Sequence, residues 1–228
     1  MRKWIRFTRQ DRLEHWLVAL CFLLLVWTGL PQKYYGAEVS QWIIAHSGGI
    51  DYTRLLHRVV GFVFTALTVW HVGSRVWGFL RKKIAPSMLP TKRDFTDAIT
   101  NLRYYMGLTD HEARCDRFDY KQKFEYWGML MGSAVMIATG LLLYAPAWFT
   151  QWLPGVLIPA AKVAHSNEAM LALLVIVVWH LYGVVFSPEV FPLDTSMFTG
   201  NISEERMKKE HPLEYERLQR EAETPPLT

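Results

Sequence analysis

The sequence predicts an all-α integral membrane protein: a bundle of four transmembrane helices with a cytoplasmic surface helix and a charged cytoplasmic C-terminal helix. Of its 228 residues, 51% are hydrophobic and 20% are charged, below the roughly 25% charge of an average soluble domain. The apolar residues are concentrated in four runs, each long enough to cross a bilayer as a helix. The runs lack the alternation of a membrane barrel, and Lys and Arg flank them instead of forming the single stripe expected for nucleic-acid binding.

The four predicted spans cover residues 13–30, 55–80, 124–146 and 163–186. Three prolines fall just beyond span ends, where a helix can stop at little cost: Pro31, Pro146 and Pro188. The first span follows a basic start, but its apolar stretch is too long for a signal peptide and no small-residue cleavage site follows it. We therefore expect residues 1–188 to form a membrane domain and residues 189–228 to form a cytoplasmic tail.

The positive charges predict the orientation of the spans. Ten Lys and Arg lie in residues 81–123, and five lie in each terminal segment, 1–12 and 187–228. The two remaining loops carry only three. Because cytoplasmic loops are enriched in Lys and Arg, we expect both termini and the 81–123 loop to be cytoplasmic, in a multi-pass protein of the bacterial inner membrane.

Two helices are predicted outside the membrane. In the 81–123 loop, four apolar residues at helical spacing predict a surface helix that ends at Gly107: Phe95, Ile99, Leu102 and Tyr105. The tail from Ser203 reads as a charged helix interrupted near Pro212. Both fit the expected cytoplasmic location.

Histidines within the spans are the main functional signal. Five of the eight lie in or at the edges of spans: His15, His57, His71, His165 and His180. Ionisable residues are costly in a bilayer and usually functional there. A single histidine would be interpreted as a hydrogen bond between helices, but five at matched depths indicate a common role.

The spacing of these histidines predicts two haem sites. His57 and His71 are 14 residues apart, about 21 Å along a helix, and His165 and His180 are 15 apart, about 22 Å. The predicted orientation places His57 and His165 near the outer face, and His71, His180 and His15 near the inner face. Two imidazoles on either side of a planar ligand form a bis-histidine haem site, and the lack of a CxxCH motif points to non-covalent haem b.

The outer haem has one obvious pair of ligands, His57 and His165. The inner haem has three candidates for two positions, and spacing alone pairs His71 with His180.

The sequence resembles the cytochrome b, or gamma, subunit of membrane-bound formate dehydrogenases and the related cytochrome b subunits of nickel–iron hydrogenases. The likeness covers nearly the whole chain and rests on five segments: EHW at 14–16, LLHRVVG at 55–61, VAHSNEAM at 163–170, WHLYG at 179–183 and MFTGNISEERMKKEHPLEYE at 197–216. The tail is the segment most specific to the formate dehydrogenase type.

The resemblance implies which histidines bind haem iron. It pairs His15, in EHW, with His180, and His57 with His165. His71 departs from the family pattern, which leaves it as the alternative inner ligand.

The resemblance also implies a quinone site beside the inner haem, on the cytoplasmic side, between residues 117–123, the start of the first helix and the end of the fourth. Asp119 and Gln122 fall on the matching polar positions before the third span. Quinone reduction takes up two protons, so polar donors near cytoplasmic water suit such a site. The alternative interpretation is that both are solvated loop residues.

The expected function is that of a membrane-anchoring dihaem cytochrome b subunit, which passes electrons between a peripheral redox subunit and menaquinone or ubiquinone. The sequence has no iron–sulfur or molybdenum motif of its own, so the resemblance implies an iron–sulfur or multihaem partner and a separate catalytic subunit. Two alternatives remain: a quinol-oxidising cytochrome b that donates electrons to a periplasmic cytochrome c, and a haem-free proton-coupled transporter.

Overall fold

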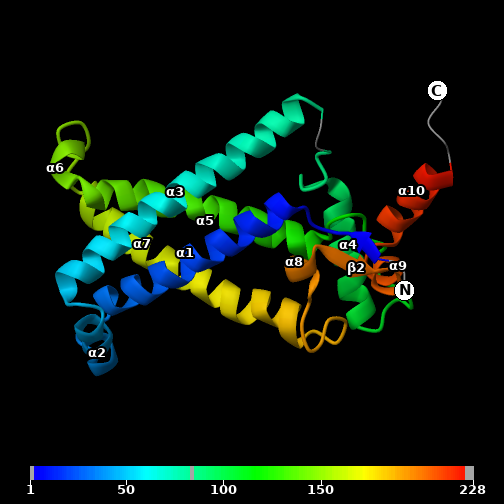
Figure 1. The fold of residues 1–228 in the computed structure, drawn as a ribbon, viewed down its shortest axis with the longest axis horizontal. Helices are drawn as coiled ribbons and strands as arrows, with labels where there is room; N and C mark the ends of the chain where they lie inside the picture. Colours follow the sequence, from blue (N-terminus) through cyan, green and yellow to red (C-terminus); the bar gives the residue numbers. More distant parts are fainter. Residues whose placement is uncertain (1–2, 83–84, 224–228) are drawn as a thin grey trace. The chain divides into compact units, whose positions relative to one another are not determined.

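A computed structural model describes residues 3–82 and 85–223. Its long helices are α1 (Arg9–Lys33), α3 (Ile50–Leu80), α5 (Tyr120–Tyr144) and α7 (Leu157–Leu174), and α7 is continued by the π-helical turns η1 (Val175–His180) and η2 (Tyr182–Phe186) (Figure 1). All four are long and apolar enough to cross a membrane. The prediction of an all-α four-helix membrane protein is confirmed.

The helices begin before the predicted spans, because hydropathy detects only the apolar centre of a long helix. α1 begins at Arg9 instead of residue 13, and the other three starts move by four to six residues. The expectation that a helix stops before Pro31 was also wrong, since α1 continues to Lys33. Proline fixes a helix-compatible φ and here costs a single hydrogen bond in the last turns. Pro146, in contrast, occupies the first position of the short helix α6 (Pro146–Phe149).

One compact unit comprises residues 10–78 and 129–183. It holds most of the long helices, together with α6 and the short helix α2 (Glu38–His46), which the sequence analysis did not predict. Its buried apolar cluster joins Cys21 of α1 to Val60 and Phe64 of α3. Most other apolar side chains of these helices are exposed, as expected for surfaces that face lipid.

The second compact unit comprises the described parts of residues 1–9, 79–128 and 184–228. Strand β1 (Lys3–Ile5) pairs antiparallel with β2 (Asn201–Ser203), so that Trp4 lies opposite Ile202. The helices outside the spans are α4 (Lys92–Tyr105), α8 (Ser196–Thr199), α9 (Glu204–Glu210) and α10 (Pro212–Glu223). Ile202, Met207 and Tyr215 form its buried core.

Local signals explain the ends of these helices. α4 begins with a capping box between Thr91 and Asp94 and ends before Gly107, whose φ of +72° suits glycine. The predicted break near Pro212 separates α9 from α10. Proline is well placed there because it lacks the N–H that the first position of a helix leaves unpaired.

Candidate functional site

The outer histidine pair lies within the four-helix unit. His57, in the third turn of α3, and His165, in α7, have ring centres 6.3 Å apart and ring planes inclined at 75°. A metal–nitrogen bond of about 2 Å, plus about 1.1 Å from the nitrogen to its ring centre, puts two axial imidazoles about 6.2 Å apart. The observed separation therefore fits an iron atom between the two rings.

Two threonines lie against this pair. Thr28 Oγ1 of α1 is 2.9 Å from His57 Nδ1, and Thr139 Oγ1 of α5 is 3.0 Å from His165 Nδ1. Each hydroxyl also donates to the carbonyl four residues earlier in its own helix, at 2.7 Å for Thr28 and 2.6 Å for Thr139. Both outer histidines are thus oriented by a hydrogen bond with a threonine of a neighbouring helix.

The inner pair lies in the same unit. His15 of α1 and His180 of η1 have ring centres 6.1 Å apart, with planes inclined at 35°. This separation also fits two axial ligands on one iron.

The structure gives His71 a carboxylate neighbour. Its Nδ1 is 2.7 Å from Glu14 Oε2. Arg75 Nη2, one turn further along α3, donates to the Asp11 carboxylate at 2.5 Å and to Glu14 at 3.3 Å. Spacing along single helices had paired His71 with His180, whereas the structure brings the His15 ring to His180.

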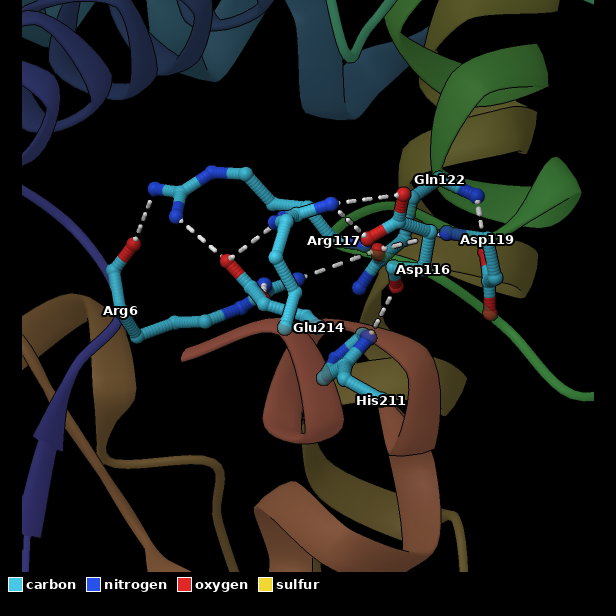
Figure 2. A network of polar contacts seen from close by, with 8 residues as sticks. Arg6, Asp116, Arg117, Asp119, Gln122, His211 and Glu214 are labelled. Carbon is cyan, nitrogen blue, oxygen red and sulfur yellow. Dashed lines mark hydrogen bonds and ion pairs between the residues drawn. The ribbon is translucent and has the colours of Figure 1, made fainter. Parts of the chain in front are cut away.

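Asp119 and Gln122 form the N-terminal cap of α5 in the second unit (Figure 2). The Gln122 backbone N–H donates to Asp119 Oδ1 at 2.7 Å, and the Asp119 N–H donates to Gln122 Oε1 at 3.3 Å. This reciprocal arrangement is a capping box. Arg6 Nη2 lies 3.4 Å from the same Gln122 oxygen. Burial raises the pKa of the Asp119 carboxyl, so that it holds a proton at higher pH than an exposed aspartate.

Comparison with known proteins identifies the family. Residues 6–200 match the family described as prokaryotic cytochrome b561. The chain belongs to this family. As a cytochrome b561 family member with four membrane-spanning helices, it is a membrane cytochrome b, and the family implies haem b as its cofactor.

The cytochrome is also similar to curated subunits of formate dehydrogenases. It is 23% identical to the formate dehydrogenase cytochrome b556(fdo) subunit of Escherichia coli (strain K12), over 96% of this chain and 95% of the relative. It is 23% identical to the nitrate-inducible cytochrome b556(Fdn) subunit of the same strain, over 92% and 89%. The corresponding figures for the Haemophilus influenzae cytochrome b556 subunit are 21%, 78% and 69%.

A buried charge network explains the tail motif of this cytochrome (Figure 2). The Glu214 carboxylate, 2% exposed, accepts hydrogen bonds from Arg6 Nη1 at 3.1 Å and Arg117 Nη1 at 2.7 Å. His211 Nδ1 is 2.9 Å from the backbone oxygen of Asp116. Burial lowers the pKa of Arg6 to about 10 and that of His211 to about 4. These side chains join the residue after β1, the segment before α5 and the start of α10, so the motif has a structural role.

The sequence analysis missed the residues next to the histidines. Thr28 and Thr139 went unnoticed, although each is followed by glycine, which gives the same Thr-Gly dipeptide in the first and third spans. Glu14 was noticed only as part of EHW. The repeated dipeptide opposite two histidines is the signal that could have identified the threonines.

Proposed function

We propose that this chain is the membrane-anchoring dihaem cytochrome b subunit of a formate dehydrogenase-like respiratory oxidoreductase, transferring electrons across the membrane between a peripheral redox subunit and the quinone pool. The observation that carries the proposal is the presence of two histidine pairs, with ring centres 6.3 Å and 6.1 Å apart, in a cytochrome b561 family chain. Similarity to formate dehydrogenase cytochrome subunits over nearly its whole length supports the choice of complex.

The four histidines would hold the two haems through their Nε2 atoms. His57 and His165 would ligate the outer haem iron, and His15 and His180 the inner one. When bound, haem b accepts and releases single electrons at its iron. In this proposal His71 pairs with the Glu14 carboxylate and does not ligate a haem iron.

The distribution of positive charges favours one orientation of the helices in the membrane. The excess of Lys and Arg in residues 1–12, 81–123 and 187–228 favours cytoplasmic termini and a cytoplasmic 81–123 segment. The outer pair would then face an iron–sulfur or multihaem subunit that receives electrons from a separate catalytic subunit. Each electron that crosses inward against the potential stores about 2.3 kcal/mol per 100 mV.

The quinone site would lie on the cytoplasmic side and include Asp119 and Gln122. Reduction of menaquinone or ubiquinone takes up two protons, and a carboxyl with a raised pKa can hold one of them near the head group. Gln122 would supply hydrogen bonds to a quinone oxygen. The Arg6 guanidinium 3.4 Å from Gln122 would favour the negative charge that develops on the head group before protonation.

The quinone site can be tested on the purified full chain with its haems chemically reduced. Reoxidation of the haems by water-soluble menaquinone and ubiquinone analogues would be followed in Asp119→Asn and Gln122→Ala. We expect both variants to retain two haems and to lose at least tenfold in reoxidation rate. Ser203→Ala, which removes the cap of α9, controls for the loss of a helix cap and should react at the wild-type rate. Wild-type rates in both variants would place the quinone elsewhere.

The choice of complex can be tested separately in membranes of the native host. Addition of formate should reduce the b-type haems of this chain, as seen in a difference spectrum against a strain that lacks it. Absence of formate-dependent reduction would overturn the assignment to a formate dehydrogenase-like complex without touching the haem ligands.

A further inference from the structure

The outer pair is supported by two matching dipeptides, Thr28-Gly29 in α1 and Thr139-Gly140 in α5. Each threonine contacts the Nδ1 atom of one outer histidine, at 2.9 Å and 3.0 Å. Thr28 has no exposed surface, so water does not compete for its hydroxyl. The two supports come from different helices and hold different histidines, yet they use the same chemistry.

The hydrogen-bond directions follow from proton counting. A threonine hydroxyl has one proton, and here it is directed at a backbone oxygen, that of Leu24 for Thr28 and that of Val135 for Thr139. The hydroxyl oxygen can therefore only accept from the imidazole. Nδ1 must then carry the ring proton, which leaves the Nε2 lone pair available on the opposite side of each ring.

The glycines set how closely the rings approach the supporting helices. A β-carbon at Gly29 would lie 3.1 Å from His57 Cε1, and one at Gly140 would lie 3.3 Å from His165 Cε1. Both distances are shorter than ordinary van der Waals contact. A side chain at either position would have to displace the imidazole by a few tenths of an ångström.

We propose that the two Thr-Gly dipeptides are positioning elements for the axial ligands of the outer haem. The threonines fix the tautomer and tilt of the His57 and His165 rings. The glycines fix how closely each ring approaches the helix that carries the threonine. This inference rests on the proposed haem ligation and adds the groups that orient the ligands. An acceptor on Nδ1 makes an imidazole a stronger electron donor to its metal, which stabilises the ferric state and lowers the midpoint potential of the outer haem.

The hydroxyl is tested by Thr28→Val and Thr139→Val, which keep the side-chain shape and remove the hydroxyl; Thr28→Val is the stricter test, because His165 also has a backbone hydrogen bond to Met136. The purified full chain would be examined for haem content, for the midpoint potential of each haem and for the low-spin ferric EPR signals. We expect two haems, an upward shift of the outer midpoint potential in each variant and an unchanged inner haem. Thr28→Ser keeps the hydroxyl and should restore wild-type values.

Matched controls lie in α3. Thr65 donates to the Gly61 carbonyl at 2.8 Å in the same backbone arrangement, so Thr65→Val should leave both potentials unchanged. A β-carbon at Gly73 would contact nothing within 4 Å, so Gly73→Ala should leave both midpoint potentials unchanged, whereas Gly29→Ala and Gly140→Ala should displace their histidines and shift the outer potential.

The outcomes separate this inference from the proposed function. An outer potential and EPR signal that stay at wild type in both valine variants would overturn the role of the hydroxyls, as would an equal shift in Thr65→Val. If Thr28→Val loses the outer haem, retention in Thr28→Ser supports the inference and loss in Thr28→Ser overturns it. Retention of both haems in His57→Ala would instead overturn the proposed ligation itself.

Discussion

The outer and inner histidine pairs have nearly equal ring separations, 6.3 Å and 6.1 Å, but they differ in ring angle and in their neighbours. The outer rings are inclined at 75° and rest on two neutral hydroxyls. The inner rings are inclined at 35°, and Glu14, next to His15 in sequence, belongs to a charged cluster with His71, Arg75 and Asp11.

The two pairs share their ring separation and differ in the groups that lie next to the rings. Equal separations are what a shared ligand requires, because metal–nitrogen bond lengths are fixed by chemistry. The neighbours are free to differ, and they tune the electron affinity of each site. Neutral hydroxyls against the outer pair and a charged cluster that begins next to His15 in sequence would give two haems of different midpoint potential, as directional electron transfer needs.

The largest effect should come from the outer ligands. His57→Ala or His165→Ala should reduce the haem content of the purified chain from two to one, because the remaining imidazole cannot hold the iron on both sides. The inner haem should keep its absorption spectrum. Two haems in either variant, measured by pyridine haemochrome, would rule out this pairing.

The inner end offers a direct contrast between two histidines. His15→Ala should lose the inner haem, whereas His71→Ala should retain both, since His71 is engaged with Glu14. The same haem assay decides between them. If His71→Ala drops to one haem and His15→Ala keeps two, then His71 is the partner of His180.

A smaller, spectroscopic effect follows from the ring angles. Nearly perpendicular axial imidazoles give a highly anisotropic low-spin ferric EPR signal, and nearly parallel ones give a rhombic signal. The oxidised protein should show both, and His57→Ala should retain only the rhombic one. Two rhombic signals in the wild type would contradict the 75° inclination of the outer pair.

His211 provides the contrast of a buried histidine outside the two pairs. Its pKa of about 4 in the folded chain lies below the ordinary 6.5, so the unfolded chain binds the extra proton first as pH falls. Its contribution to stability is therefore present above pH 6.5 and is lost between pH 6.5 and 4. The loss by pH 4.5 amounts to about 2–3 kcal/mol.

Amide exchange of α10, corrected for the intrinsic rate at each pH, measures this change. Protection should fall on acidification in the wild type and much less in His211→Gln, which should keep two haems. Equal protection of the wild type at pH 7 and pH 5 would show that burial of this imidazole has no energetic consequence.

Sequence patterns predict some features of this architecture, and they cannot predict others for physical reasons. Hydropathy predicted four spans, but their polar first turns were missed because caps such as Asp119 and Gln122 are indistinguishable from loop residues. Depth along a helix placed His57 and His165 together, yet depth cannot choose between His15 and His71, which depends on how helices are rotated. The pairing of β1 with β2 joins three-residue strands about 200 residues apart, and strands this short have no periodic signal.

The count of haem groups per chain tests the central claim most directly. The purified full-length protein should contain two haem b groups per chain by pyridine haemochrome, and acid acetone should extract both, because the four proposed ligands are histidines and the sequence has no CxxCH motif. A single haem per chain, or haem that remains attached to the polypeptide after extraction, would contradict the account.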